Sequence, residues 1–143
     1  MDSDSVNLTG CRMFKKLFIV LVIGAIMAIA TIPMWTDKMA EDAFRNPERQ
    51  LSSENVKKAI QTRMYIYMYP DARRLSEKAI IYFPESKNLP YFIYTAAMSS
   101  EKSNEYAAAI HWYGYFIDLF PGHEWISQAK NNHIRLKAMH TSK

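Results

Sequence analysis

Hydrophobic positions along the chain form one long uncharged run, followed by a stretch with the periodicity of an α-helix. Residues 17–35 carry no charged side chain and are almost entirely apolar. Further on, apolar side chains recur at intervals of three and four positions, beginning with Val56, Ala59, Ile60 and Met64. This spacing places them on one face of an α-helix. The pattern therefore predicts an all-α protein, in which one N-terminal transmembrane helix precedes a domain of packed helices.

Polar residues and prolines divide the second part of the chain into five predicted helices. Ser53 and Glu54 are typical of a helix start, Pro84 and Pro121 are typical of helix ends, and Asp71 is placed to cap the second helix. We expect helices at about residues 53–69, 71–83, 90–98, 104–120 and 124–139, with a polar loop at 99–104. The short connections between them predict antiparallel neighbours.

The chain is thereby divided into four segments. We interpret them as a cytoplasmic tail (1–16), a transmembrane helix or uncleaved signal anchor (17–35), a helical extension and linker (36–52) and a helical domain (53–143). Basic residues before the apolar run favour an N-terminus in the cytoplasm and a C-terminal domain across the membrane, with Trp35 at the interface. Two alternatives stay open. Residues 28–30 (AIA) match a signal-peptidase site, and translation from Met13 would shorten the tail.

A repeated ending indicates an internal repeat. Phe83-Pro84 and Phe120-Pro121 recur at a distance of 121 − 84 = 37 residues. Tetratricopeptide repeats recur at about 34 residues, each a pair of helices. Small residues are expected where such helices cross closely. Ala72, Ala79 and Ala109 occupy such positions, whereas Phe116 stands where a small residue is expected.

The stretch 105–130 (EYAAAIHWYGYFIDLFPGHEWISQAK) resembles the repeats of bacterial envelope tetratricopeptide proteins, including the β-barrel assembly lipoprotein and Tol-Pal coordinator families. Pro121, with an aromatic residue at Trp125 and a small one at Ala129, carries the resemblance. The chain departs from these families in having a single-span anchor and fewer repeats. The resemblance implies a scaffold without naming its partner.

In such repeats the first helix of each pair lines a concave groove. The register implied by the resemblance makes Tyr91, Tyr94, Trp125 and Arg135 the candidate protein-binding residues.

The predicted helix at 104–120 is unusually aromatic. Its polar exceptions, His111, Gly114 and Asp118, lie on one stripe that is expected to face solvent. Either the helix is packed between its neighbours, or part of its aromatic surface contacts another protein.

Composition and motifs argue against several classes of function. The net charge is +4, and because acidic and basic residues are interspersed, no nucleic-acid-binding patch is indicated. The four glycines are too widely spaced for a phosphate-binding loop. A lone Cys11 cannot form an internal disulfide, and His123-Glu124 lacks the second histidine of a zinc-protease motif because Ser127 takes its place. We expect no enzyme activity, metal or cofactor.

Two functional hypotheses remain. The first is a membrane-anchored scaffold or adaptor that mediates protein–protein interaction in envelope assembly, secretion or division. The second is a structural accessory subunit of an energy-transducing or secretion complex, whose span packs against other subunits. Both predict contact with the lipid bilayer through residues 17–35. The expected site is the bacterial inner membrane with a periplasmic C-terminal domain, and a mitochondrial inner membrane is the alternative.

Overall fold

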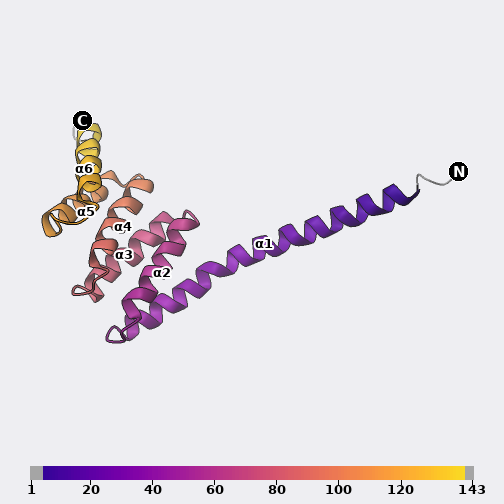
Figure 1. Cartoon of the computed structure of the whole chain (residues 1–143), viewed down its shortest axis with the longest axis horizontal. Helices are drawn as coiled ribbons and strands as arrows, with labels where there is room; N and C mark the ends of the chain where they lie inside the picture. Colours follow the sequence, from indigo (N-terminus) through magenta and orange to yellow (C-terminus); the bar gives the residue numbers. More distant parts are fainter. Residues whose placement is uncertain (1–4, 141–143) are drawn as a thin grey trace. The chain divides into compact units, whose positions relative to one another are not determined.

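The fold is helical, as the sequence predicts. The structure, a computed structural model, describes the backbone of residues 5–140 and the side chains of residues 15–27, 31 and 34–140. Within these limits it contains six α-helices: α1 (Ser5–Arg45), α2 (Ser52–Tyr65), α3 (Tyr69–Tyr82), α4 (Leu89–Lys102), α5 (Tyr106–Leu119) and α6 (Ile126–His140) (Figure 1). The chain divides into two compact units, Met1–Trp35 and Thr36–Lys143.

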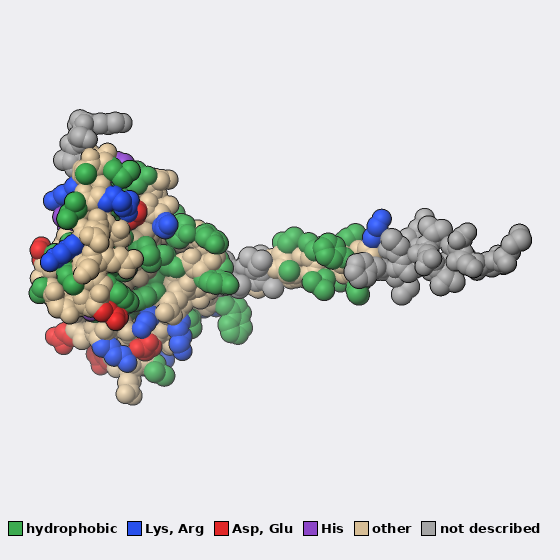
Figure 2. All heavy atoms as spheres, turned by 45° about the horizontal axis from the view of Figure 1, so that its top comes forward, with side chains coloured by type: hydrophobic (Ala, Val, Ile, Leu, Met, Phe, Trp, Pro, Cys, Tyr) green, Lys and Arg blue, Asp and Glu red, His purple; other side chains and the backbone are tan. Residues whose placement is uncertain are grey.

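The first unit carries the apolar run on α1. Its described side chains are largely exposed, with Leu17, Val20 and Leu21 at 67%, 68% and 66% of their full accessible surface. Figure 2 shows hydrophobic side chains gathered on this described stretch. Across the described residues, no helix combines the length and the apolar character needed to cross a membrane. The side chains of the matched cleavage site at 28–30, and most side chains of the predicted tail 1–16, lie outside what the structure describes.

The second unit is a sequential array, in which each helix from α2 to α6 packs against the next (Figure 1). The end of α1 joins it, because Ala40, Ala43 and Phe44 are buried in the same cluster as Val56 and Ala72. Residues 36–45 therefore supply core side chains, although the sequence pattern assigned them to an extension and linker. A second cluster, around Tyr113 and Phe116, lies between α4, α5 and α6.

The array repeats every 37 residues. Helices α2, α4 and α6 begin at intervals of 89 − 52 = 37 and 126 − 89 = 37, and α3 and α5 begin at an interval of 106 − 69 = 37. One backbone hydrogen bond closes each junction before α2, α4 and α6: Ser52 N to Arg49 O, Leu89 N to Ser86 O, and Ile126 N to His123 O. The three junctions begin at Pro47, Pro84 and Pro121, again 37 apart. The fold is therefore a repeat-like helical array, compatible with a helical-hairpin repeat in which residues 36–45 take the position of the second helix of a preceding hairpin.

The turn inside each hairpin also repeats. Tyr67, between α2 and α3, and Asn104, between α4 and α5, both have φ = 62°. Residues with positive φ are uncommon outside glycine; asparagine is enriched among them, whereas a bulky residue is an outlier. The backbone geometry of the repeat is thus preserved even where the residue is unfavourable.

The predicted close-packing alanines are confirmed as core residues, since Ala72, Ala79 and Ala109 have no exposed surface. The equivalent of Ala79 in the second hairpin is Phe116, because 79 + 37 = 116, and it is also fully buried.

Several predicted boundaries were wrong. The loop expected at 99–104 is mostly helix, because α4 continues to Lys102. Ser99 and Ser100 donate their hydroxyls to the carbonyls of Thr95 and Ala96 at 2.6 and 2.7 Å, and this lets both serines be fully buried.

The first hairpin is shifted as well. Helix α2 ends at Tyr65 rather than near residue 69, because the chain turns through the left-handed Tyr67. Helix α3 begins at Tyr69 with Pro70 in its first turn, so Asp71 lies inside the helix and not at its cap.

Replacing Ala79 by leucine is expected to lower the free energy of unfolding by about 1–3 kcal/mol, because the fully buried site has no room for a larger side chain. Chemical denaturation of the full chain in mild detergent, followed by circular dichroism, measures this change. Ile81→Leu, at a side chain that is 76% exposed on the same helix, is the matched control. An unchanged midpoint for Ala79→Leu would contradict the packing register.

Candidate protein-binding face

The first helices of the hairpins, α2 and α4, and the residue leading into α6 carry one continuous row of side chains. The Lys57 ammonium lies 5.3 Å from the centre of the Tyr91 ring and donates to Asn88 Oδ1 at 3.3 Å. The Tyr91 ring meets the Trp125 ring edge-on, with centroids 6.5 Å apart. We call the row Lys57, Tyr91 and Trp125 the first-helix row. It crosses the array from one hairpin to the next.

Two residues of this row combine a packed body with an accessible edge. Tyr91 and Trp125 are both half-buried. Burial raises the pKa of the Tyr91 hydroxyl, with a hydrogen bond from Thr95 acting in the opposite direction. The phenol therefore stays neutral at physiological pH and can offer a partner both apolar surface and a hydrogen bond.

Tyr94 is a core residue in this structure. It is 7% exposed, and its ring lies 5.4 Å from Phe116 and 5.0 Å from Trp125. Among the described residues, its buried hydroxyl oxygen has no hydrogen-bond partner. Burial raises its pKa, and the nearby Glu101 carboxylate adds to the effect. Since Trp125 packs against it, Tyr94 supports the row from beneath. Its role in binding stays a prediction.

Arg135 is engaged within the chain. Its Nη2 donates to Glu101 Oε1 at 2.6 Å and to Asn132 Oδ1 at 3.3 Å. Tyr113 donates to Glu101 Oε2 at 3.1 Å, and Asn132 Nδ2 donates to Tyr113 Oη at 3.2 Å, which closes a ring of four side chains. The hydrogen bond to Glu101 raises the pKa of Arg135. The ring ties α6 to α4 and α5.

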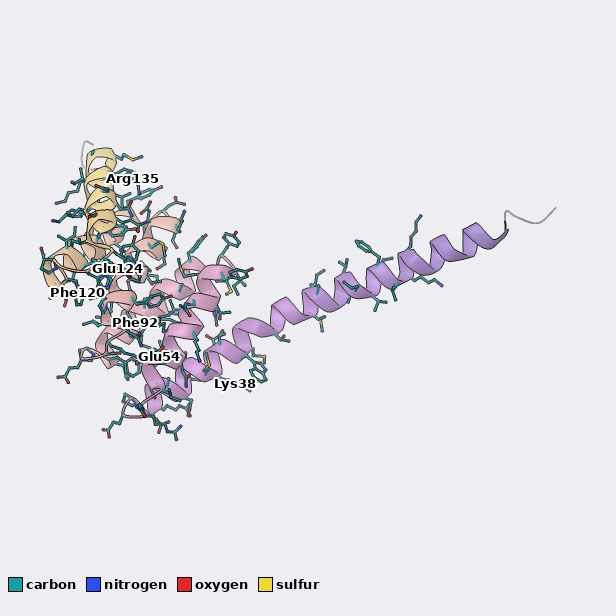
Figure 3. All side chains as sticks on the ribbon, in the orientation of Figure 1. Lys38, Glu54, Phe92, Phe120, Glu124 and Arg135 are labelled. Carbon is teal, nitrogen blue, oxygen red and sulfur yellow. The ribbon has the colours of Figure 1, made fainter. Side chains whose placement is uncertain are left out.

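Charged and polar side chains also connect α2 to the start of α4. The Glu54 carboxylate accepts from Asn88 Nδ2 at 3.1 Å and pairs with Lys87 Nζ at 3.1 Å. The hydrogen bond from Asn88, followed by that from Lys87, lowers the pKa of Glu54. Figure 3 labels Glu54 on α2 and Arg135 on α6, the two outer first helices. The face thus combines an aromatic row with acidic and basic side chains that are already paired.

Sequence reasoning missed Lys57, Asn88, Glu101 and Asn132. The repeat length contains a signal for one of them, because Asn88 and Trp125 are equivalent: 88 + 37 = 125. Both backbone amides are bonded by a side chain two residues earlier, Asn88 N by Ser86 Oγ and Trp125 N by His123 Nδ1.

The stripe expected to face solvent on α5 is partly covered. His111 and Asp118 are exposed, but Gly114 lies so close to α6 that an added Cβ would meet His133 Nε2 at 3.4 Å. Burial lowers the pKa of His133. Of the aromatic residues on this helix, Tyr113 is buried, Trp112 is half-buried and Tyr115 is 40% exposed. In the part of the chain that the structure describes, no three metal-ligating side chains gather.

Comparison with known proteins finds no family model, no curated relative and no solved structure that matches this chain.

Proposed function

We propose that this chain is a membrane-anchored adaptor that binds partner proteins through the first-helix row. The observation that carries the proposal is the continuous contact of Lys57 with the Tyr91 ring and of Tyr91 with the Trp125 ring across successive hairpins. Tyrosine and tryptophan are enriched among the residues that contribute most of the binding energy at protein interfaces. Tyr94 supports the row from beneath.

The repeat supports a scaffold of the tetratricopeptide kind. Hairpins that follow one another at a constant interval expose their first helices on a common face, and this presents an extended surface to a partner. The 37-residue interval exceeds the usual tetratricopeptide repeat length of about 34. Because no family model matches, the proposal of a scaffold is supported by the regular spacing of the helices.

The anchor is supported by the uncharged run at 17–35 and by the exposed apolar side chains of its described part. A continuous apolar surface of this kind is unfavourable in water and is covered by lipid or protein. The charge pattern favours a cytoplasmic N-terminus, and on this basis we propose that the array lies on the periplasmic side of a bacterial inner membrane.

Truncating Tyr91 or Trp125 to alanine is expected to weaken partner binding by about thirtyfold, equivalent to about 2 kcal/mol. The full chain is purified in mild detergent, co-purifying proteins are identified by mass spectrometry, and recovery of each is compared among variants. Tyr115→Ala, at a tyrosine that is 40% exposed on a second helix, is the matched control. Each variant is first shown to melt cooperatively, because Trp125 also contacts the core. Equal recovery with all three variants would contradict binding through the row.

The accessory-subunit hypothesis is favoured by one observation, the exposure of apolar side chains on every side of α1 from Leu17 to Ile23. Replacing residues 17–35 by an unrelated apolar sequence of equal length separates the two hypotheses. If this exchange abolishes recovery of the partner while Tyr91→Ala leaves it unchanged, the span itself is the interface. Intact-mass measurement verifies that the anchor is retained.

A further inference from the structure

The turn between α2 and α3 carries two strongly exposed tyrosines. Tyr65 and Tyr67 are 85% and 77% exposed, and the Tyr67 ring meets the Tyr69 ring edge-on, with centroids 6.0 Å apart. Tyrosine combines an apolar ring with a hydroxyl that favours a wet environment. It is therefore enriched where lipid meets water.

The backbone conformation of this turn does not favour tyrosine. Tyr67 has the same φ of 62° as Asn104, its equivalent in the second hairpin. Asparagine adopts this conformation readily, whereas an aromatic residue is an outlier there. The repeat therefore provides an internal comparison: the same turn is built with the favourable residue in one hairpin and with an exposed, unfavourable tyrosine in the other. The ring at 67 is best explained by what it contacts outside the fold.

A buried arginine ties this turn to the start of the array. Arg63 is 2% exposed and lies in the last turn of α2, where its carbonyl accepts from Met68 N at 2.9 Å. Its guanidinium donates to Thr36 Oγ1 at 3.2 Å and to Asp37 Oδ1 at 2.7 Å. The tyrosine turn is thus held beside the two residues that directly follow the apolar run.

From this juxtaposition we infer that the α2–α3 turn is a lipid contact, with Tyr65 and Tyr67 in the headgroup region of the bilayer. The inference rests on the proposed anchoring of residues 17–35. A helical residue advances the chain by about 1.5 Å, so Thr36 and Asp37 stay within a few ångströms of an interfacial Trp35. The headgroup regions together add about 10–15 Å to a hydrocarbon core of about 30 Å, so an interfacial layer several ångströms deep flanks the core on each side. Lys38, labelled in Figure 3, is exposed next to this point and suits anionic headgroups.

The test compares equivalent positions of the two hairpins in the full chain. Cys11 is replaced by serine, and one cysteine is introduced at Tyr67, at Asn104 or at Ile26, then labelled with an environment-sensitive fluorophore. The chain is reconstituted into phosphatidylcholine–phosphatidylglycerol vesicles that contain quenchers on either the headgroup or the acyl chain. Headgroup quenching at position 67 is expected to exceed that at position 104 by about threefold or more, since only the first turn reaches the interface. Acyl-chain quenching is expected at position 26.

The outcomes are distinct. If position 26 is quenched by acyl chains and positions 67 and 104 respond equally to the headgroup quencher, the lipid contact is wrong and the anchor stands. If position 26 is not quenched, the anchor fails and the lipid contact fails with it. Tyr67→Asn provides a second check and should melt at no lower temperature than the natural chain. A clear loss of stability in that variant would show that the fold needs the ring, which would overturn the inference.

Discussion

Replacing Asp37 and Asp71 together by asparagine is expected to lower the free energy of unfolding by about 3–5 kcal/mol. Both carboxylates face Arg63, at 2.7 Å from Asp37 and 3.5 Å from Asp71. Asparagine keeps the shape and the acceptor oxygen but removes the negative charge. A guanidinium remains protonated in proteins, and the double variant removes both of these negative charges from beside the buried cation.

The single variants should cost less, because either remaining carboxylate still compensates Arg63. Asp37 is 50% exposed and Asp71 is 35% exposed, so the cost of burying charge arises mainly from the arginine. Chemical denaturation in mild detergent, monitored by circular dichroism, measures the change. Asp42→Asn is the matched control, because its pair with Arg49 is exposed on both sides and is worth about 0–1 kcal/mol. A double variant as stable as this control would mean that Arg63 is hydrated when its partners are neutral.

Replacing Phe116 by alanine is expected to cost about 3–5 kcal/mol, although it restores the small residue that the repeat pattern calls for. Two successive interfaces between hairpins, α3 with α4 and α5 with α6, fill equivalent sites with side chains of opposite size. The first cluster combines Ala79 with Phe92, and the second combines Phe116 with Ala129, where 79 + 37 = 116 and 92 + 37 = 129. All four side chains have no exposed surface. Each interface therefore needs one large side chain, and either of its two helices can supply it.

Because the large and small residues exchange places between the two interfaces, we expect the stability losses of Phe116→Ala and Ala129→Phe to be non-additive. Ala129→Phe alone should overpack the second cluster by about 1–3 kcal/mol. The double variant Phe116→Ala/Ala129→Phe reproduces the arrangement of the first cluster, and we expect it to be more stable than the sum of the single changes by about 0.5–3 kcal/mol. Denaturation of the two single variants and the double variant completes the cycle. Additive losses would show that the two sites do not share one volume.

Much of the fold follows from local signals. The start of α2 at Ser52 and the breaks at Pro84 and Pro121 are visible in the sequence, because serine and proline act on the backbone within a few residues. The end of α4 could not be predicted in this way. Ser99 and Ser100 are typical of a loop by composition, and only packing against neighbouring helices makes their bonds to the preceding turn favourable.

The first repeat junction was concealed for a similar reason. Pro47 belongs to the same 37-residue series as Pro84 and Pro121, yet the helix before it continues from the apolar run. Since these residues follow the apolar run on the same helix, the sequence pattern alone does not identify Ala40, Ala43 and Phe44 as core residues.

The candidate face was predictable only as a set of aromatic positions. Tyr91 and Trp125 lie on the first helices or lead into them, as the repeat register implies. The burial of Tyr94 depends on Trp125 folding over it, and the pairing of Arg135 depends on Glu101, which lies in the segment predicted as a loop. Contacts between helices decide both, and helical periodicity contains no information about them.

The three proline junctions have a consequence for the length of the array. Because each is closed by the same backbone hydrogen bond, any two are interchangeable as end points. Removing or duplicating the stretch from one junction to the next joins chain ends in a geometry that both already adopt. The backbone of the array can therefore grow or shrink in whole units, but the side chains at each new interface must be matched, because removing residues 84–120 brings Ala79 against Ala129 and duplicating them brings Phe116 against Phe92. Under the proposed function, each added unit lengthens the face offered to a partner by one hairpin.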